Sequence, residues 1–126
     1  MTRQLRQGAG WRLGWDPVAT EFQGLVGSAD WAVELTGPEF EAFCHLMLQL
    51  AETLKAMREE LMEEEAIACE AANEHLWMEV RGVPQAYHLS FIVLQGRRAE
   101  GKWPPAATMA LLEAIHTLKL ELGMPS

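Results

Sequence analysis

Apolar side chains recur every three or four residues between Thr36 and Leu61. The stripe consists of Phe40, Phe43, Met47, Leu50, Leu54, Met57 and Leu61. This spacing places all of them on one side of an α-helix. Thr36 and Glu39 fit a capping box, and Pro38 suits the first turn. The pattern predicts a core-facing main helix over residues 36–61 that frays at the glutamates of residues 59–65, because like charges four residues apart repel.

Alternating apolar and polar positions before this helix predict three short strands, over residues 10–15, 22–26 and 31–35. A hairpin about residues 27–30 would place Val26 opposite Trp31 and keep the apolar side chains on one face. We expect residues 1–9 to form a flexible tail. We expect the tryptophans of this region to fill the core of the first sheet, with a base-stacking platform as the alternative. These residues are Trp11, Trp15 and Trp31.

Three more alternating segments follow the main helix, over residues 67–71, 76–80 and 87–93. Pairing them about their turns collects the apolar residues on one face. On the other face it would place Glu70, Trp77 and Ser90 in one row, and Glu79 beside His88 in the next. Residues 96–102 read as a loop, and a second helix is predicted from Pro104-Pro105 to Gly123.

The order of these segments predicts an α+β fold made of a duplicated unit, βββα-βββα, with the helices packed on the sheets. The length of 126 residues fits a single domain over residues 10–126, with halves at 10–65 and 66–126.

Composition narrows the class of protein further. The formal net charge is −8, and residues 59–65 alone hold five glutamates. This acidity disfavours nucleic acid as a partner, because nucleic-acid binders carry a basic footprint. No apolar run has membrane-spanning length, and no signal-peptide pattern occurs, so we expect a cytoplasmic protein. Cys44 and Cys69 lack metal-ligand spacing and are interpreted as reduced thiols, and we expect neither a metal nor a cofactor.

Four segments carry a resemblance to a known family. They are G-W-R-L-G-W-D-P (10–17), G-S-A-D-W-A-V-E-L-T (27–36), L-W-M-E-V-R-G (76–82) and R-R-A-E-G-K-W-P-P (97–105). With them, most of the chain resembles an uncharacterised family of small cyanobacterial proteins, catalogued as a domain of unknown function. The resemblance implies a fold similar to the Whirly-type single-stranded-DNA-binding transcriptional regulators, and no established activity.

The polar face of the second sheet is the first candidate site. Trp77 is a large aromatic residue on a polar face, which favours a partner surface there together with Glu79 and His88. A carboxylate beside an imidazole could also perform acid–base chemistry. The alternative for this pair is a charged cross-strand contact on a solvated face.

The second candidate is the segment from Gly96 to Trp103, where bases and an aromatic residue interleave. The basic side chains could bind phosphates while the aromatic ring stacks on a nucleobase of single-stranded nucleic acid. The residues concerned are Arg97, Arg98, Lys102 and Trp103. The alternative is a loop whose Trp103 fills the core and whose arginines pair with Glu100 or with the glutamate-rich end of the main helix.

The remaining candidates are weaker. The glutamates of residues 59–65 lack the spacing and glycine of a calcium loop, and His45 and His116 each stand alone on a helix. The leading hypothesis is a non-catalytic binding or regulatory module that acts through protein–protein contacts and forms a homodimer through an apolar sheet or helix surface. A single-stranded nucleic-acid binder and a small enzyme or ligand receptor using Glu79 and His88 are the alternatives.

Overall fold

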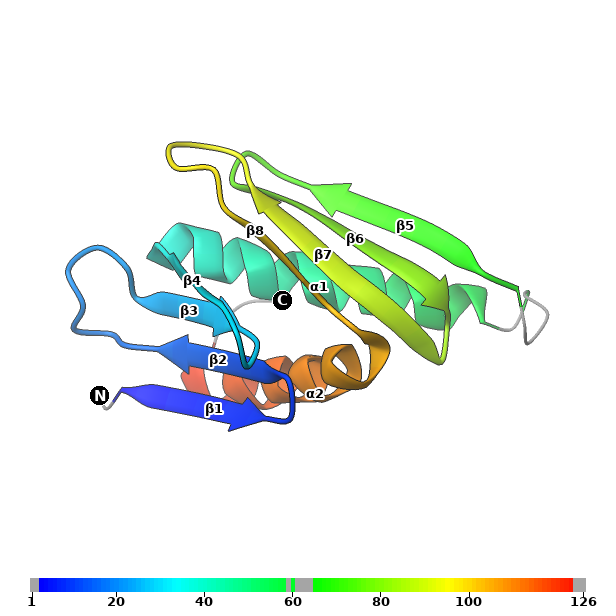
Figure 1. Ribbon diagram of the computed structural model, residues 1–126, viewed down its shortest axis with the longest axis horizontal. Coiled ribbons are helices and arrows are strands. Elements are labelled where there is room, and N and C mark those ends of the chain that lie inside the picture. Colours follow the sequence, from blue (N-terminus) through cyan, green and yellow to red (C-terminus); the bar gives the residue numbers. More distant parts are fainter. Residues whose placement is uncertain (1–2, 59, 61–64, 124–126) are drawn as a thin grey trace.

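The protein folds into two antiparallel four-stranded sheets and two long helices, as a computed structural model shows (Figure 1). The structure describes residues 3–58, 60 and 65–123. The first sheet contains β1 (Gln4–Gly8), β2 (Trp11–Trp15), β3 (Gly24–Gly27) and β4 (Ala32–Leu35), in that order. The second contains β5 (Ile67–Ala72), β6 (Leu76–Val83), β7 (Ala86–Val93) and β8 (Glu100–Trp103). The helices are α1 (Gly37–Met57) and α2 (Pro105–Leu122).

The helix ends follow from local chemistry. Thr36 accepts a hydrogen bond from the Glu39 amide, and the Glu39 carboxylate accepts one from the Thr36 amide, which is the predicted capping box. Helix α2 ends at Gly123, whose φ of 67° is left-handed, as predicted from the glycine at that position. The glutamate-rich segment after α1 lies largely outside the described residues.

The α+β class is confirmed, but each sheet has four strands rather than the predicted three. The additional strands are β1, which falls in the segment predicted as a tail, and β8, which falls in a predicted loop. Both are short and largely polar, and both gain backbone hydrogen-bond partners by pairing with the neighbouring strands β2 and β7. These two segments become strands because they pair with neighbouring strands in the folded protein. Hydrophobic alternation along the sequence does not reveal such pairing.

The predicted registers are each displaced by two residues. Val26 pairs with Val33 rather than Trp31, and Val80 pairs with Leu89 rather than Tyr87. A shift of two keeps every side chain on its predicted face, because strand side chains alternate with a period of two. The faces were therefore predicted correctly, while the cross-strand neighbours were wrong.

The buried core draws on both halves of the chain. Helix α1 packs on β5 and β6 and also reaches β3 and β4, while α2 packs on β7 and β2. Phe43, Phe91 and Trp103 form an aromatic cluster at the centre, with ring centroids 5.6 to 5.8 Å apart. The Trp103 indole donates a hydrogen bond to the Gly27 carbonyl at 2.9 Å, which ties β8 to the first sheet.

Two of the three N-terminal tryptophans pack as predicted. Trp11 and Trp15 are half-buried against the core, and Trp15 stacks on Phe40 with centroids 5.2 Å apart. Trp31 instead lies against the second sheet, 5.0 Å from Trp103 and 6.2 Å from Phe91. A Cβ atom at Gly101 would come within 2.3 Å of the Trp31 ring, so the ring needs a glycine beneath it.

Candidate binding surface

The outer face of the β5–β8 sheet is open, because both helices pack on its inner face. Buried and accessible residues alternate along β6 and β7, which separates the core side from this outer side. The register sets the outer rows: Trp77 lies between Ala72 and Ile92, Glu79 between Glu70 and Ser90, and Arg81 between Ala68 and His88. On β8 this face carries Glu100 and Lys102.

Trp77 is the one large aromatic residue of these outer rows. Its ring is half-buried, and its indole nitrogen donates to the Glu70 carboxylate at 3.3 Å. A shallow hollow of about 550 Å³ lies beside it, lined by Ile92 and Lys102 of the outer face and, at Gly101, by the ring of Trp31 that packs under β8. The hollow combines apolar ring surface with charges of both signs, an arrangement typical of protein-recognition surfaces.

Glu79 and His88 are not neighbours in one row, so that prediction is wrong. Glu79 lies opposite Ser90 and forms an ion pair with Arg81 at 3.1 Å, whereas His88 lies opposite Arg81 and is exposed. The carboxylate and the imidazole therefore lack the direct cross-strand contact on which the acid–base hypothesis was based.

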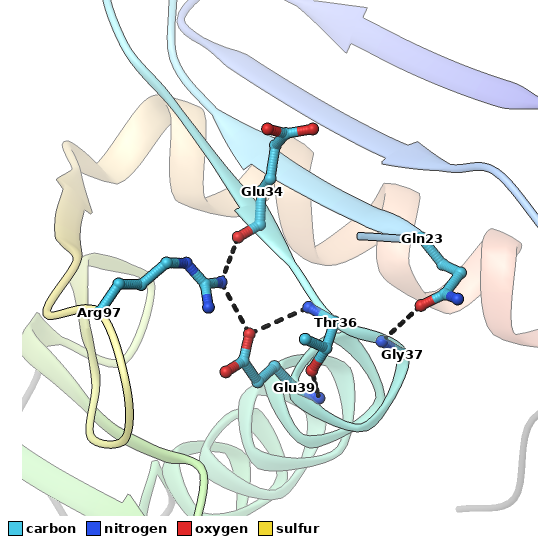
Figure 2. A network of polar contacts seen from close by, with 6 residues as sticks. All are labelled: Gln23, Glu34, Thr36, Gly37, Glu39 and Arg97. Atoms are coloured by element: carbon cyan, nitrogen blue, oxygen red, sulfur yellow. Dashed lines mark hydrogen bonds and ion pairs between the residues drawn. The ribbon is translucent and has the colours of Figure 1, made fainter. Parts of the chain in front are cut away.

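Arg97, in the β7–β8 connection, contacts residues of the first half of the chain (Figure 2). Its guanidinium donates to the Glu39 carboxylate at 2.8 Å and to the Glu34 carbonyl, and it lies 4.7 Å from the centre of the Phe22 ring. Arg97 thus links the second sheet to β4 and to the start of α1. The predicted alternative partners, Glu100 and the far end of α1, are wrong for this arginine.

The other three nucleic-acid candidates do not converge. Trp103 is 0% exposed, so its ring cannot stack on a nucleic-acid base in this conformation, and the core-filling alternative is confirmed. Arg98 is exposed on the β7–β8 connection, and Lys102 lies on the outer face near Trp77. The basic residues and the aromatic residue that alternate along this segment of the sequence therefore do not share one surface of the folded protein.

The contacts of Glu39 at the start of α1 lower the pKa of its carboxyl group. Burial works to raise the pKa of Glu39, but the hydrogen bonds from Arg97 and the Thr36 amide and the nearby positive charge outweigh it. The pKa of this carboxyl group consequently lies below its usual value. Only 7% of the residue is exposed, so its charge depends on these partners.

The structure also brings His45 and His116 together. Both are exposed and line one groove of about 850 Å³ between α1 and α2. The helical pattern gave no signal for this, because the two residues are far apart in sequence and only the packing of the helices joins them. Among the described residues no group of three or more His, Cys, Asp or Glu side chains is placed to hold a metal ion.

Trp31 was not predicted as part of the site. Arg12 holds the turn that carries it, by donating to the Ser28 carbonyl at 2.8 Å and to the Trp31 carbonyl at 2.9 Å. Gly101 is the sequence signal that could have indicated this contact, since a glycine in a short strand marks a close approach.

Together the two sheets, the covering helices and the open aromatic face define an α+β protein with a candidate recognition surface. The chain belongs to the family described as a domain of unknown function, DUF1818, whose model matches residues 6–118. This confirms the predicted membership of an uncharacterised family.

The fold occurs in a solved structure. The crystal structure of a protein of unknown function from the DUF155 family of Prochlorococcus sp. NATL2A is similar, with a TM-score of 0.85 and 27% sequence identity. The likeness covers 94% of this chain and 98% of that chain. No curated protein matches the chain. The further likeness to Whirly-type regulators stays a prediction.

No helix in the described part of the chain is long and apolar enough to cross a membrane.

Proposed function

We propose that the protein is a non-catalytic binding module, and that the outer face of the β5–β8 sheet is its recognition surface. The observation that carries the proposal is the hollow beside Trp77, which Trp31 also lines, on a sheet face whose other residues are mostly polar. Tryptophan is enriched among the residues that dominate binding energy at protein interfaces. The ring of Trp77 is already held by Glu70, so little side-chain freedom is lost on binding.

The charges around the hollow favour a polypeptide as the partner. Glu70, Glu79 and Glu100 outnumber Arg81 and Lys102 on this face, and the whole chain carries a net charge of −8. A polyanion such as single-stranded DNA would be repelled by such a surface. A protein segment with an apolar anchor residue and flanking charges of both signs would match it.

A peptide selection tests this proposal. A random phage-displayed peptide library is selected on the wild-type protein, and recovered peptides are measured by fluorescence polarisation. Trp77→Ala should weaken the binding of such a peptide by roughly tenfold or more, because truncating a large aromatic residue removes an interface anchor. Leu120→Ala is the matched control, since Leu120 is 83% exposed on α2, away from this face. Equal affinities for the two variants would reject the proposed surface.

A titration with labelled single-stranded oligonucleotides at low salt separates the nucleic-acid alternative from this proposal. Binding that weakens steeply with added salt, and that is lost in an Arg98→Ala/Lys102→Ala variant, would favour that alternative.

A further inference from the structure

The strand β5 forms one edge of the second sheet, and its outer backbone side has no strand partner in the described part of the chain. Exposed edges are normally protected by prolines, by lysines or by bulges. The sequence of β5, I-A-C-E-A-A, has a single charge and neither proline nor lysine, and all six residues pair regularly with β6. Apart from Glu70, the sequence of β5 therefore carries none of these devices against strand addition.

The inner side of β5 is also incompletely covered. Ile67, Cys69 and Ala71 face α1 but are only half-buried, whereas their neighbours on β6, such as Met78 and Val80, are 0% exposed. An additional strand beside β5 would extend the sheet and cover this row.

We propose that a second copy of the chain occupies this edge, by antiparallel pairing of β5 with its symmetry mate about Cys69. The two sheets would then form one continuous sheet with a two-fold axis at its centre. This inference goes beyond the binding role proposed above and does not depend on it.

The register follows from the faces. Antiparallel partners must lie on the same face, so only registers that pair residues of like parity are allowed. With Cys69 opposite Cys69 of the second copy, Ile67 lies opposite Ala71, which keeps the inner row apolar. Two allowed registers adjoin this one. The register centred on Glu70 would place two glutamates opposite each other and Ile67 opposite Asn73, and the register centred on Ala68 would place Glu65 opposite Ala71 in the inner row. Both are disfavoured, because each places a charged or polar side chain in the apolar inner row.

Charge complementarity supports the register centred on Cys69. Ala68 would lie opposite Glu70 of the second copy, and Arg81 lies beside Ala68 on β6. Neighbouring strands are about 4.8 Å apart, so Arg81 and that glutamate would be about 9.6 Å apart across a small alanine. Two long side chains can bridge this separation, and the two-fold axis generates the contact twice.

The first test is sedimentation equilibrium combined with disulfide cross-linking. At tens of micromolar the wild-type protein should sediment as a dimer. Cα atoms directly opposite each other in antiparallel strands are about 4.5 to 5.5 Å apart, within disulfide range. Copper–phenanthroline should therefore cross-link Cys44→Ala protein through Cys69 and should leave Cys69→Ala protein uncross-linked. Cys44 is 2% exposed and cannot substitute for Cys69.

The second test separates this interface from any other. In Ala68→Glu protein the new carboxylate would lie opposite Glu70 of the second copy, and the two-fold axis would create this repulsion at two places. The substitution should weaken dimerisation by roughly tenfold. Within one chain the new carboxylate would face Arg81, so the fold should be retained. Ala72→Glu is the matched control, with the same charge on the same face of β5 but not opposite Glu70. A monomer at tens of micromolar, cross-linking that does not need Cys69, or equal effects of the two glutamates would each overturn the inference.

Discussion

Removing the guanidinium of Arg97 should destabilise the fold by about 2 kcal/mol, a value based on hydrogen bonds to charged groups of about 1.5–3 kcal/mol. Arg97 joins the Glu39 carboxylate at 2.8 Å to the Glu34 carbonyl and covers the Phe22 ring. Its side chain is 36% exposed, so solvent screening places the ion pair near the lower end of that range. The contact with Phe22 adds about 0.5–1 kcal/mol.

Urea unfolding of Arg97→Ala and wild-type protein measures this difference. The neighbouring Arg98→Ala is the matched control, because Arg98 is exposed, and it should lie within about 0.5 kcal/mol of wild type. In a double-mutant cycle with Glu39→Gln, the two substitutions should be non-additive, since they remove the same contact.

The pH dependence provides an independent check. The folded-state pKa of Glu39 is lowered, so its ionised form contributes stability above the usual carboxyl value of 4.5. That contribution is lost as the pH falls through the lowered folded value. Arg97→Ala should therefore cost less stability at about pH 3 than at neutral pH. A loss under about 0.5 kcal/mol at neutral pH, or a loss independent of pH, would refute the role assigned to Arg97.

Three further predictions concern the core, the thiols and nucleic acid. Gly101→Ala should destabilise the protein by about 1–3 kcal/mol in urea unfolding, because the new methyl group must displace the ring of Trp31. Burial raises the pKa of the Cys44 thiol to about 12, so Cys44 of the native protein at mildly alkaline pH should react much more slowly with a disulfide reagent than Cys44 of urea-unfolded protein. Labelled single-stranded oligonucleotides at low salt should show no saturable binding in fluorescence polarisation, given the acidity of the chain.

The elements with strong local signals could be predicted from the sequence. The main helix has a capping box and a regular apolar stripe, and the structure contains both. The faces of β6 and β7 were also correct, because strict alternation fixes which side chains share a face.

The register could not be predicted in the same way. A shift of two residues preserves every face, so alternation does not distinguish the alternatives, and the turns decide between them. In the β5–β6 turn, Asn73 accepts hydrogen bonds from the amides of His75 and Leu76, and the chain reverses one residue later than predicted. Val83 and Ala86 close the next turn more tightly than expected. The predicted Glu79–His88 row failed for this reason.

The candidate site was predicted in part. Trp77 lies on the outer face as expected, but the hollow beside it depends on Trp31, which arrives from the other half of the chain. Arg97 and Trp103 were predicted as nucleic-acid contacts, but each donates a hydrogen bond to the first half of the chain. Arg97 donates to the Glu34 carbonyl and Trp103 to the Gly27 carbonyl. Contacts between segments so distant in sequence leave no periodic signal.

Chemical-shift mapping is the measurement that tests the proposed recognition surface most directly. Isotope-labelled protein is titrated with a peptide selected on the wild-type chain, and backbone amide and indole signals are followed. The account predicts that the largest shifts occur at the Trp77 and Trp31 indoles and along the outer face of β6–β8. Shifts confined to the groove between α1 and α2, or to the first sheet, would contradict it.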